Sequence, residues 1–112
     1  MGLMALVLAT GLLGVTSVFA QDFMTFESGN ELFDVCNVNV QINDPRHIFC
    51  VGYVAGTSDA LNSQGTICTP KDVTIRQTVD VIVNYLRKHS EELHVAAPTL
   101  TGTALGQAFP CK

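Results

Sequence analysis

The chain has 112 residues and a formal net charge of −4, from ten acidic and six basic side chains. This length allows one domain at most, and a composition that is 47% hydrophobic and 14% charged is too apolar for a disordered chain. The acidic balance excludes the basic footprint of a nucleic-acid-binding protein and disfavours adsorption to anionic membranes.

Residues 1–20 carry no charged side chain and form an apolar run that ends in Val18-Phe19-Ala20. An apolar core closed by small residues is typical of a secretory signal peptide, although a basic residue usually precedes the core. The alternative is a transmembrane anchor, because the run approaches the ~20 residues that span a bilayer. Interspersed glycines and hydroxyl residues, with no basic stop, favour cleavage. We predict a signal peptide at 1–20 and one exported domain at 21–112.

Four helices are predicted in the mature part, and the first begins at Ser28. Ser28 and Glu31 have the spacing of a capping box, in which each side chain satisfies a backbone N–H of the first turn. Phe23 or Phe26 precedes this cap and is expected to staple the entry of the helix. Residues 37–42 alternate polar and apolar side chains. They are expected to form an extended loop or a frayed helix end.

The second helix is predicted over about residues 46–62. Pro45 follows the turn signal Asn43-Asp44 and suits the first turn of a helix. Gly52, Gly56 and Ala60 are spaced by four and share one face. Each glycine costs ~1 kcal/mol relative to alanine inside a helix. We therefore expect a structural role for both glycines, in which another helix backbone approaches this face closely.

The third helix is predicted to start at Thr74, which forms a second capping box with Gln77. Its buried stripe is expected to comprise Ile75, Val79, Ile82, Val83 and Leu86. The fourth helix is predicted to follow residues 90–92, whose acidic side chains suit a helix N-terminus. Pro98 removes a backbone hydrogen bond, so a kink or a restart is expected there.

All four cysteines lie in the mature part, and an even count in a short exported chain indicates disulfides. Spacing alone leaves three pairings open. Once the helices are placed, the first hairpin brings Cys36 near Cys50, and antiparallel third and fourth helices bring Cys68 near Cys111. These two pairings are the prediction. The alternatives are half of a zinc site at His47 and Cys50, or the same two residues as a nucleophile pair.

Catalytic and cofactor motifs are absent from the sequence, so neither enzymatic activity nor a cofactor or metal is predicted. Asp59 lies among small and apolar residues, and we expect it to pair with an arginine or to cap a helix rather than to act as a base. Arg76 and Asp80 are expected to form an exposed pair. His89 and His94 are expected to be solvated loop histidines.

Residues 26–112 resemble the Rap1a/Tai family of type VI secretion immunity proteins. The resemblance rests on a set of short motifs in chain order: Ser28-Gly29-Asn30-Glu31-Leu32 with Cys36, Cys50-Val51-Gly52-Tyr53-Val54-Ala55-Gly56, Asp59-Ala60, Cys68-Thr69-Pro70, Val73-Thr74 with Gln77, Tyr85-Leu86, Ser90-Glu91, Ala104-Leu105 and Ala108-Phe109-Pro110-Cys111. The family implies an all-α, four-helix bundle (of the HdeA-like or Rap1a type) that is periplasmic and often homodimeric. It also implies that the protein binds an amidase-like, peptidoglycan-degrading effector and occludes its active site.

The partner surface is predicted on two polar loops, because loops between rigid elements commonly carry function. One is the turn made of Lys88, His89, Ser90, Glu91 and Glu92, and the other is the loop at 62–66 with Ser63 and Gln64. A second hypothesis is an acid-protective, chaperone-like protein of the envelope, in which protonation of carboxylates would expose apolar surface. A thiol oxidoreductase is the weakest alternative, because no C-x-x-C motif is present.

Overall fold

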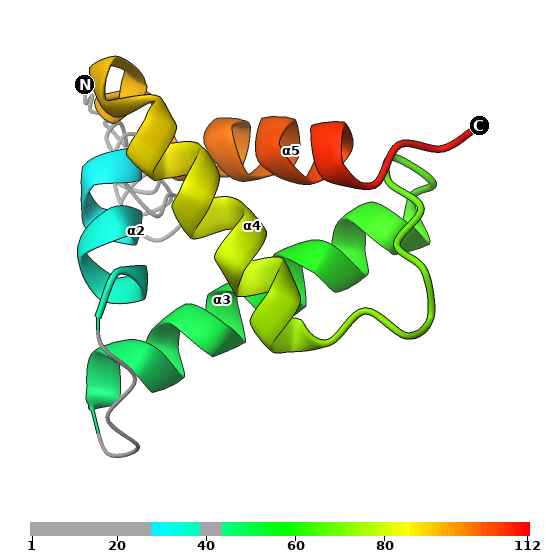
Figure 1. Ribbon diagram of the computed structural model, residues 1–112, viewed down its shortest axis with the longest axis horizontal. Coiled ribbons are helices and arrows are strands. Elements are labelled where there is room, and N and C mark those ends of the chain that lie inside the picture. The colour runs from blue at the N-terminus through cyan, green and yellow to red at the C-terminus, as the bar shows by residue number, and fades with distance from the viewer. Residues whose placement is uncertain (1–27, 39–43) are drawn as a thin grey trace, which may run out of the picture.

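The computed structural model describes residues 28–38 and 44–112. Its α-helices are α2 (Gly29–Cys36), α3 (Pro45–Ser63), α4 (Ile75–Lys88) and α5 (Ala97–Ala108), and a 3-10 turn, η1 (Ser90–Glu92), separates α4 from α5. Figure 1 shows α4 crossing α3, with α2 at one end of the molecule and α5 running back from the end of α4. The described residues contain four α-helices and no strand, which confirms the predicted all-α bundle.

The predicted signal peptide and the entry contacts of Phe23 and Phe26 lie outside the described residues, as does most of the segment at 37–42. Among the helices that are described, none has the length and apolar character needed to cross a membrane.

Side-chain caps fix the starts of the first three described helices. The hydroxyl of Ser28 accepts a hydrogen bond of 3.4 Å from the backbone N–H of Glu31. The carboxylate of Asp44 accepts one of 2.9 Å from the N–H two residues later, directly before α3. Thr74 and Gln77 form both halves of a capping box, with distances of 3.1 and 2.8 Å. The predicted starts of α2, α3 and α4 are therefore confirmed.

The start of α5 shows why the chain needs a turn before its last helix. α5 begins at Ala97 and has Pro98 in its first turn, where the missing N–H costs no helical hydrogen bond. The expected restart at Pro98 is thus confirmed. The acidic residues Glu91 and Glu92, which were expected at the N-terminus of this helix, belong instead to the separate turn η1.

The core lies where the four helices meet. Its largest fully buried side chains come from every helix and from the α3–α4 connection: Leu32, Ile67, Ile82, Leu86, Leu105, Val54, Thr101 and Cys50. Burying each aliphatic side chain of this size contributes roughly 1.5–3 kcal/mol. The stripe predicted on α4 is buried except for Ile75, which is 39% exposed because the first turn of α4 borders two surface grooves.

Two disulfides hold the helices together, and both are the predicted pairs. Cys36–Cys50 joins the end of α2 to α3 inside the core, with a Cα–Cα distance of 5.1 Å. Cys68–Cys111 ties the α3–α4 connection to the segment after α5, with a Cα–Cα distance of 4.9 Å, and is exposed. No cysteine is free. The alternatives of a zinc half-site or a thiol nucleophile at Cys50 are therefore wrong.

Candidate functional site

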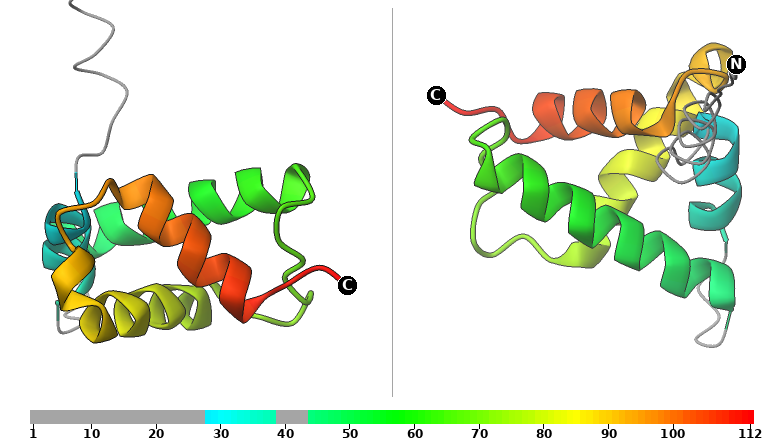
Figure 2. Two further views of the ribbon diagram at one scale, coloured as in Figure 1. Left: turned by 90° about the horizontal axis from the view of Figure 1, so that it is seen from above. Right: turned by 180° about the vertical axis from the view of Figure 1, so that it is seen from behind.

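The two loops predicted as the partner surface lie at opposite ends of the molecule (Figures 1 and 2). Residues 88–92, here called the acidic turn, follow the end of α4 beside the start of α2. Ser63, the last residue of α3, and Gln64 lie at the other end of the bundle, near the C-terminus. The structure therefore does not combine the two loops into one continuous surface.

The acidic turn is organised around His89. Its Nδ1 atom lies 3.5 Å from Oε2 of Glu92 and 3.8 Å from Oε1 of Glu91. Its ring lies against Tyr85, with centroids 4.1 Å apart, and the Tyr85 hydroxyl donates a 3.4 Å hydrogen bond to Oε2 of Glu92. One imidazole and two carboxylates offer ligand atoms within 4.8 Å of one another, so these are the described side chains that could hold a metal ion.

Tyr85 links the acidic turn to α4. Burial of the ring raises the pKa of Tyr85 above its ordinary value, and the negative charge and hydrogen bond of Glu92 raise it further, with a smaller contribution from Glu91. Each of these effects favours the neutral phenol. The hydroxyl therefore remains a donor to Glu92 over the physiological pH range, and the turn keeps this contact.

Backbone hydrogen bonds anchor the segment after the acidic turn to the start of α2. The N–H of Asn30 donates to the carbonyl of Leu93 at 2.8 Å, and the N–H of Gly29 donates to the carbonyl of Val95 at 2.9 Å. These donors belong to the first turn of α2, which has no intrahelical acceptors for them. A Cβ atom at Gly29 would lie 3.0 Å from the Leu93 carbonyl oxygen. Gly29 is therefore the glycine that permits a close backbone approach.

The loop at the far end is also ordered, through Asn62. Its side-chain amide donates to the carbonyl of Ser58 at 2.9 Å and to the Thr69 hydroxyl at 3.1 Å, and its oxygen accepts from the Thr69 N–H at 2.9 Å. Gly65 supplies the positive φ of 74° that the turn requires. Ser63 and Gln64 are exposed above this network.

No described helix of this chain makes the close approach predicted at Gly52 and Gly56. Both glycines are exposed, and no described neighbouring atom lies within 4 Å of a Cβ added at either position. They share this face of α3 with the exposed side chain of Ile48. Asp59 is also exposed and forms no ion pair with the described residues, so its expected pairing is not found.

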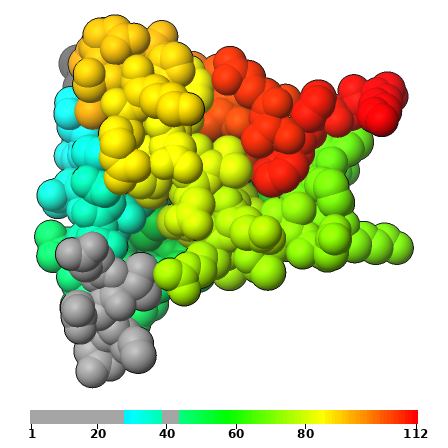
Figure 3. All heavy atoms as spheres, viewed as in Figure 1, coloured from blue at the N-terminus to red at the C-terminus, as the bar shows by residue number. Residues whose placement is uncertain are grey.

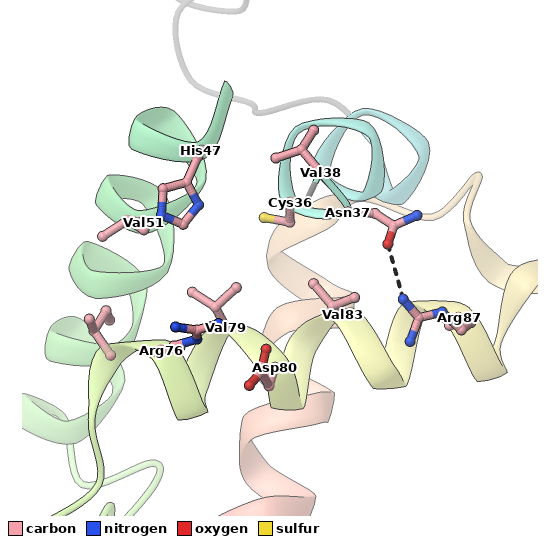
Figure 4. Close-up of a pocket in the computed structure, with 11 residues that line it drawn as sticks. Cys36, Asn37, Val38, His47, Val51, Arg76, Val79, Asp80, Val83 and Arg87 are labelled. Atoms are coloured by element: carbon pink, nitrogen blue, oxygen red, sulfur yellow. Dashed lines mark hydrogen bonds between the residues drawn. The ribbon is translucent and has the colours of Figure 1, made fainter. Parts of the chain in front are cut away.

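A groove of about 460 Å³ opens between the end of α2, the first half of α3 and α4 (Figures 3 and 4). Its floor is apolar and is formed by Val51, Val79 and Val83, together with Cys36 of the buried disulfide. It combines an apolar floor with a polar rim, as ligand and peptide sites do.

Charged side chains line the rim of this groove. Figure 4 shows His47 and Arg76 at one end, Arg87 at the other, and Asp80 between them on α4. Arg87 donates to the side-chain oxygen of Asn37 at 3.0 Å. The predicted ion pair between Arg76 and Asp80 is not formed, since neither residue has a salt bridge within the described part of the chain.

Sequence reasoning missed the groove as a site. Arg87 and Asn37 are 50 positions apart in the sequence, and no local pattern predicts their contact. The only usable signal was the alternation of arginines with apolar residues along α4, which an exposed helix face also produces.

Comparison with known proteins yields one finding for this chain. A family model described as Rap1a immunity proteins matches residues 28–111. Searches of curated proteins and of solved structures return no significant match. The matched span contains the four α-helices of the described residues, both disulfides, the acidic turn and the groove. The chain therefore belongs to the Rap1a immunity protein family.

Proposed function

We propose that the chain is a periplasmic immunity protein that neutralises an amidase-like, peptidoglycan-degrading effector by occluding its active site with the acidic turn. Membership of an immunity family supports protection against a secreted effector as the general role. The observation that carries the finer proposal is the order of the turn. Tyr85 and Glu92 hold it from α4, and the start of α2 holds the segment that follows. An ordered surface loses little conformational entropy when it binds.

The chemistry of the turn suits a basic rim around the effector's cleft. Glu91 is exposed, Glu92 is partly exposed, and Ser90 and Lys88 present further polar groups beside them. Clustered carboxylates speed the encounter with a positively charged surface, and this effect weakens with salt. The contact needs no catalytic group on the immunity protein, in keeping with a role as an inhibitor rather than an enzyme.

The two disulfides support an exported location, because such bonds persist in oxidising compartments such as the periplasm. We further propose that residues 1–20 are the signal peptide that directs export. N-terminal sequencing of protein recovered from the periplasm tests this step. A mature protein that begins at Gln21 is expected, and an intact Met1 on membrane-bound protein would contradict it.

A homodimer is the second component of the proposal. Its surface is the exposed face of α3, where Ile48 is 66% and Phe49 is 51% exposed, and Gly52 and Gly56 would let another helix approach closely. Large exposed apolar side chains of this kind mark interaction surfaces. Sedimentation velocity tests it: the wild type should sediment as a dimer, and Ile48→Glu should give a folded monomer. A monomeric wild type would refute the dimer.

We expect an amidase-like effector gene beside the gene for this chain. The product of that gene, immobilised as a catalytically inactive variant, is the partner in the binding test. The double variant Glu91→Lys/Glu92→Lys should associate at least about tenfold more slowly than the wild type at low salt. The same variant should fail to block release of cleaved peptidoglycan fragments by the active effector. The double variant Ser63→Ala/Gln64→Ala, measured in the same assay, tests whether the loop at the far end of the bundle also contacts the effector.

The matched control is Asp59→Lys/Asp72→Lys, which changes the net charge equally at exposed carboxylates outside the acidic turn. It should retain most of the wild-type association rate. If both double variants slow association equally, net charge rather than the turn explains the effect. If neither does, the turn is not the contact surface.

A further inference from the structure

We infer that the groove between α2, α3 and α4 binds an extended acidic segment of a partner protein, with two carboxylate side chains that flank an apolar one. The residues that line this groove do not include the acidic turn. The inference therefore concerns a second binding site and does not depend on the proposed effector contact.

The positive charges at the two ends of the groove favour binding of a negatively charged ligand. Arg76 and Arg87 form no ion pair with the described residues, although the chain has four more acidic than basic groups. Arg87 is instead held by the neutral side-chain oxygens of Asn37 at 3.0 Å and Asn84 at 3.1 Å. These two bonds orient the guanidinium and leave its charge unneutralised and further N–H donors unused. Such a group pairs strongly with a carboxylate.

The length of the groove favours a peptide over a small ion. Arg76 and Arg87 are eleven positions apart on one helix, which places their backbones about 16 Å apart at 1.5 Å per residue. An extended chain rises about 3.3 Å per residue, and alternate side chains face the same way. Two carboxylates four residues apart thus span about 13 Å, and the flexible arginine side chains cover the difference.

The floor of the groove accounts for the central residue of the segment. Val79 and Val83 are almost fully buried and lie between the two arginines on α4, and Val51 of α3 faces them across the groove. An apolar side chain two residues after the first carboxylate points to this floor. Contact with the valines adds the hydrophobic component of binding.

Asp80 provides a further test of the inference, because it is the one carboxylate among the described residues that line the groove. It lies on α4 between the two arginines and opposes an anionic ligand. Removing its charge should strengthen binding of an acidic segment, whereas removing the charge of either arginine should weaken it. A merely structural role for the arginines would not produce this pair of effects.

The experiment titrates the isotope-labelled mature protein with three synthetic peptides and follows its backbone amides by NMR. The first is acetyl-Glu-Ser-Leu-Ser-Glu-amide. The second carries lysines in place of the glutamates, and the third, acetyl-Ser-Glu-Leu-Glu-Ser-amide, places the carboxylates on the face opposite the leucine. The first should shift the amides of Val79 and Val83 in low salt, the second should not, and the third should bind about threefold or more weakly.

Variants then assign the effect to individual side chains. Arg76→Gln and Arg87→Gln should each weaken the first peptide about threefold, as expected for exposed ion pairs. Asp80→Asn should strengthen it about twofold. Lys71→Gln, at an exposed cation outside the groove, is the matched control and should leave the affinity unchanged. Helical circular dichroism confirms that each variant is folded.

Three results would overturn the inference. One is the absence of shifts at Val79 and Val83, and another is equal binding of the acidic and basic peptides. The third is a peptide that converts a dimer to a monomer in sedimentation, which would assign the groove to a second copy of this chain.

Discussion

Replacing Gly52 and Gly56 by alanine should stabilise the fold of the Ile48→Glu variant, the proposed monomer in which no second copy covers this face of α3. Both positions lie inside α3, are exposed, and have no described neighbouring atom within 4 Å of an added Cβ. Each substitution therefore recovers the helix propensity that glycine lacks, about 0.8–1 kcal/mol, without a steric cost. The double variant should gain about 2 kcal/mol, which corresponds to a rise in Tm of about 8–15 °C for a domain of this size.

Urea unfolding followed by circular dichroism measures this gain, and the m-value should stay constant because the folded surface hardly changes. Gly29→Ala is the contrasting variant, since its Cβ would lie 3.0 Å from the Leu93 carbonyl oxygen and 3.2 Å from the Leu93 Cα. It should cost about 1–3 kcal/mol. In this monomeric background, a double variant of α3 that is less stable than its Ile48→Glu parent would refute the reasoning.

Three further predictions concern the bridges, a cap and a pKa. Mild thiol treatment followed by alkylation and mass spectrometry should label Cys68 and Cys111 first, because the other bridge is buried. Removing the exposed bridge in Cys68→Ala/Cys111→Ala should lower the free energy of unfolding by ~4 kcal/mol, the loop-entropy contribution. Cys36→Ala/Cys50→Ala should lose ~3 kcal/mol of loop entropy and also the packing of two buried side chains. Thr74→Ala should cost ~1 kcal/mol in urea unfolding and Thr74→Ser much less, since only serine keeps the cap. Glu92→Gln should lower the pKa of Tyr85 in an ultraviolet titration only in part, because burial is the largest cause of the raised pKa. Because folding raises the pKa of Tyr85, the neutral form of this side chain contributes to the stability of the fold. That contribution is complete below the pKa of tyrosine in the unfolded chain and is lost as the pH rises through the pKa of Tyr85 in the folded protein.

Local chemistry explains why the helix starts and the disulfide pairing were predictable. A cap such as Thr74 with Gln77 acts within three residues, and proline at position 45 or 98 constrains only its own turn. These signals need no knowledge of distant neighbours. The disulfides followed because two pairs of helix ends can meet in only a few ways once the helices are placed.

The face of α3 shows where such reasoning fails. A spacing of four residues establishes that Gly52 and Gly56 share one side of a helix, but it carries no information on whether that side is covered. Gly29 was named only as one residue of a family motif, although the chain packs against it more closely than against the other described glycines. The reason lies in Leu93 and Val95, more than sixty residues away, whose carbonyls accept the hydrogen bonds of α2.

The groove could not be predicted either, because its lining comes from three helices that lie apart in the sequence. Its charges are informative because the expected pairing between them is missing. Arg76 and Asp80 have the spacing of a surface ion pair, and such pairs contribute little to stability. Because this one does not form, Arg76 and Arg87 gain no compensation from a carboxylate within the described residues. Two arginines held apart on one helix, over valines that α2 and α3 enclose, contribute more to a complex with an acidic partner than to the isolated fold.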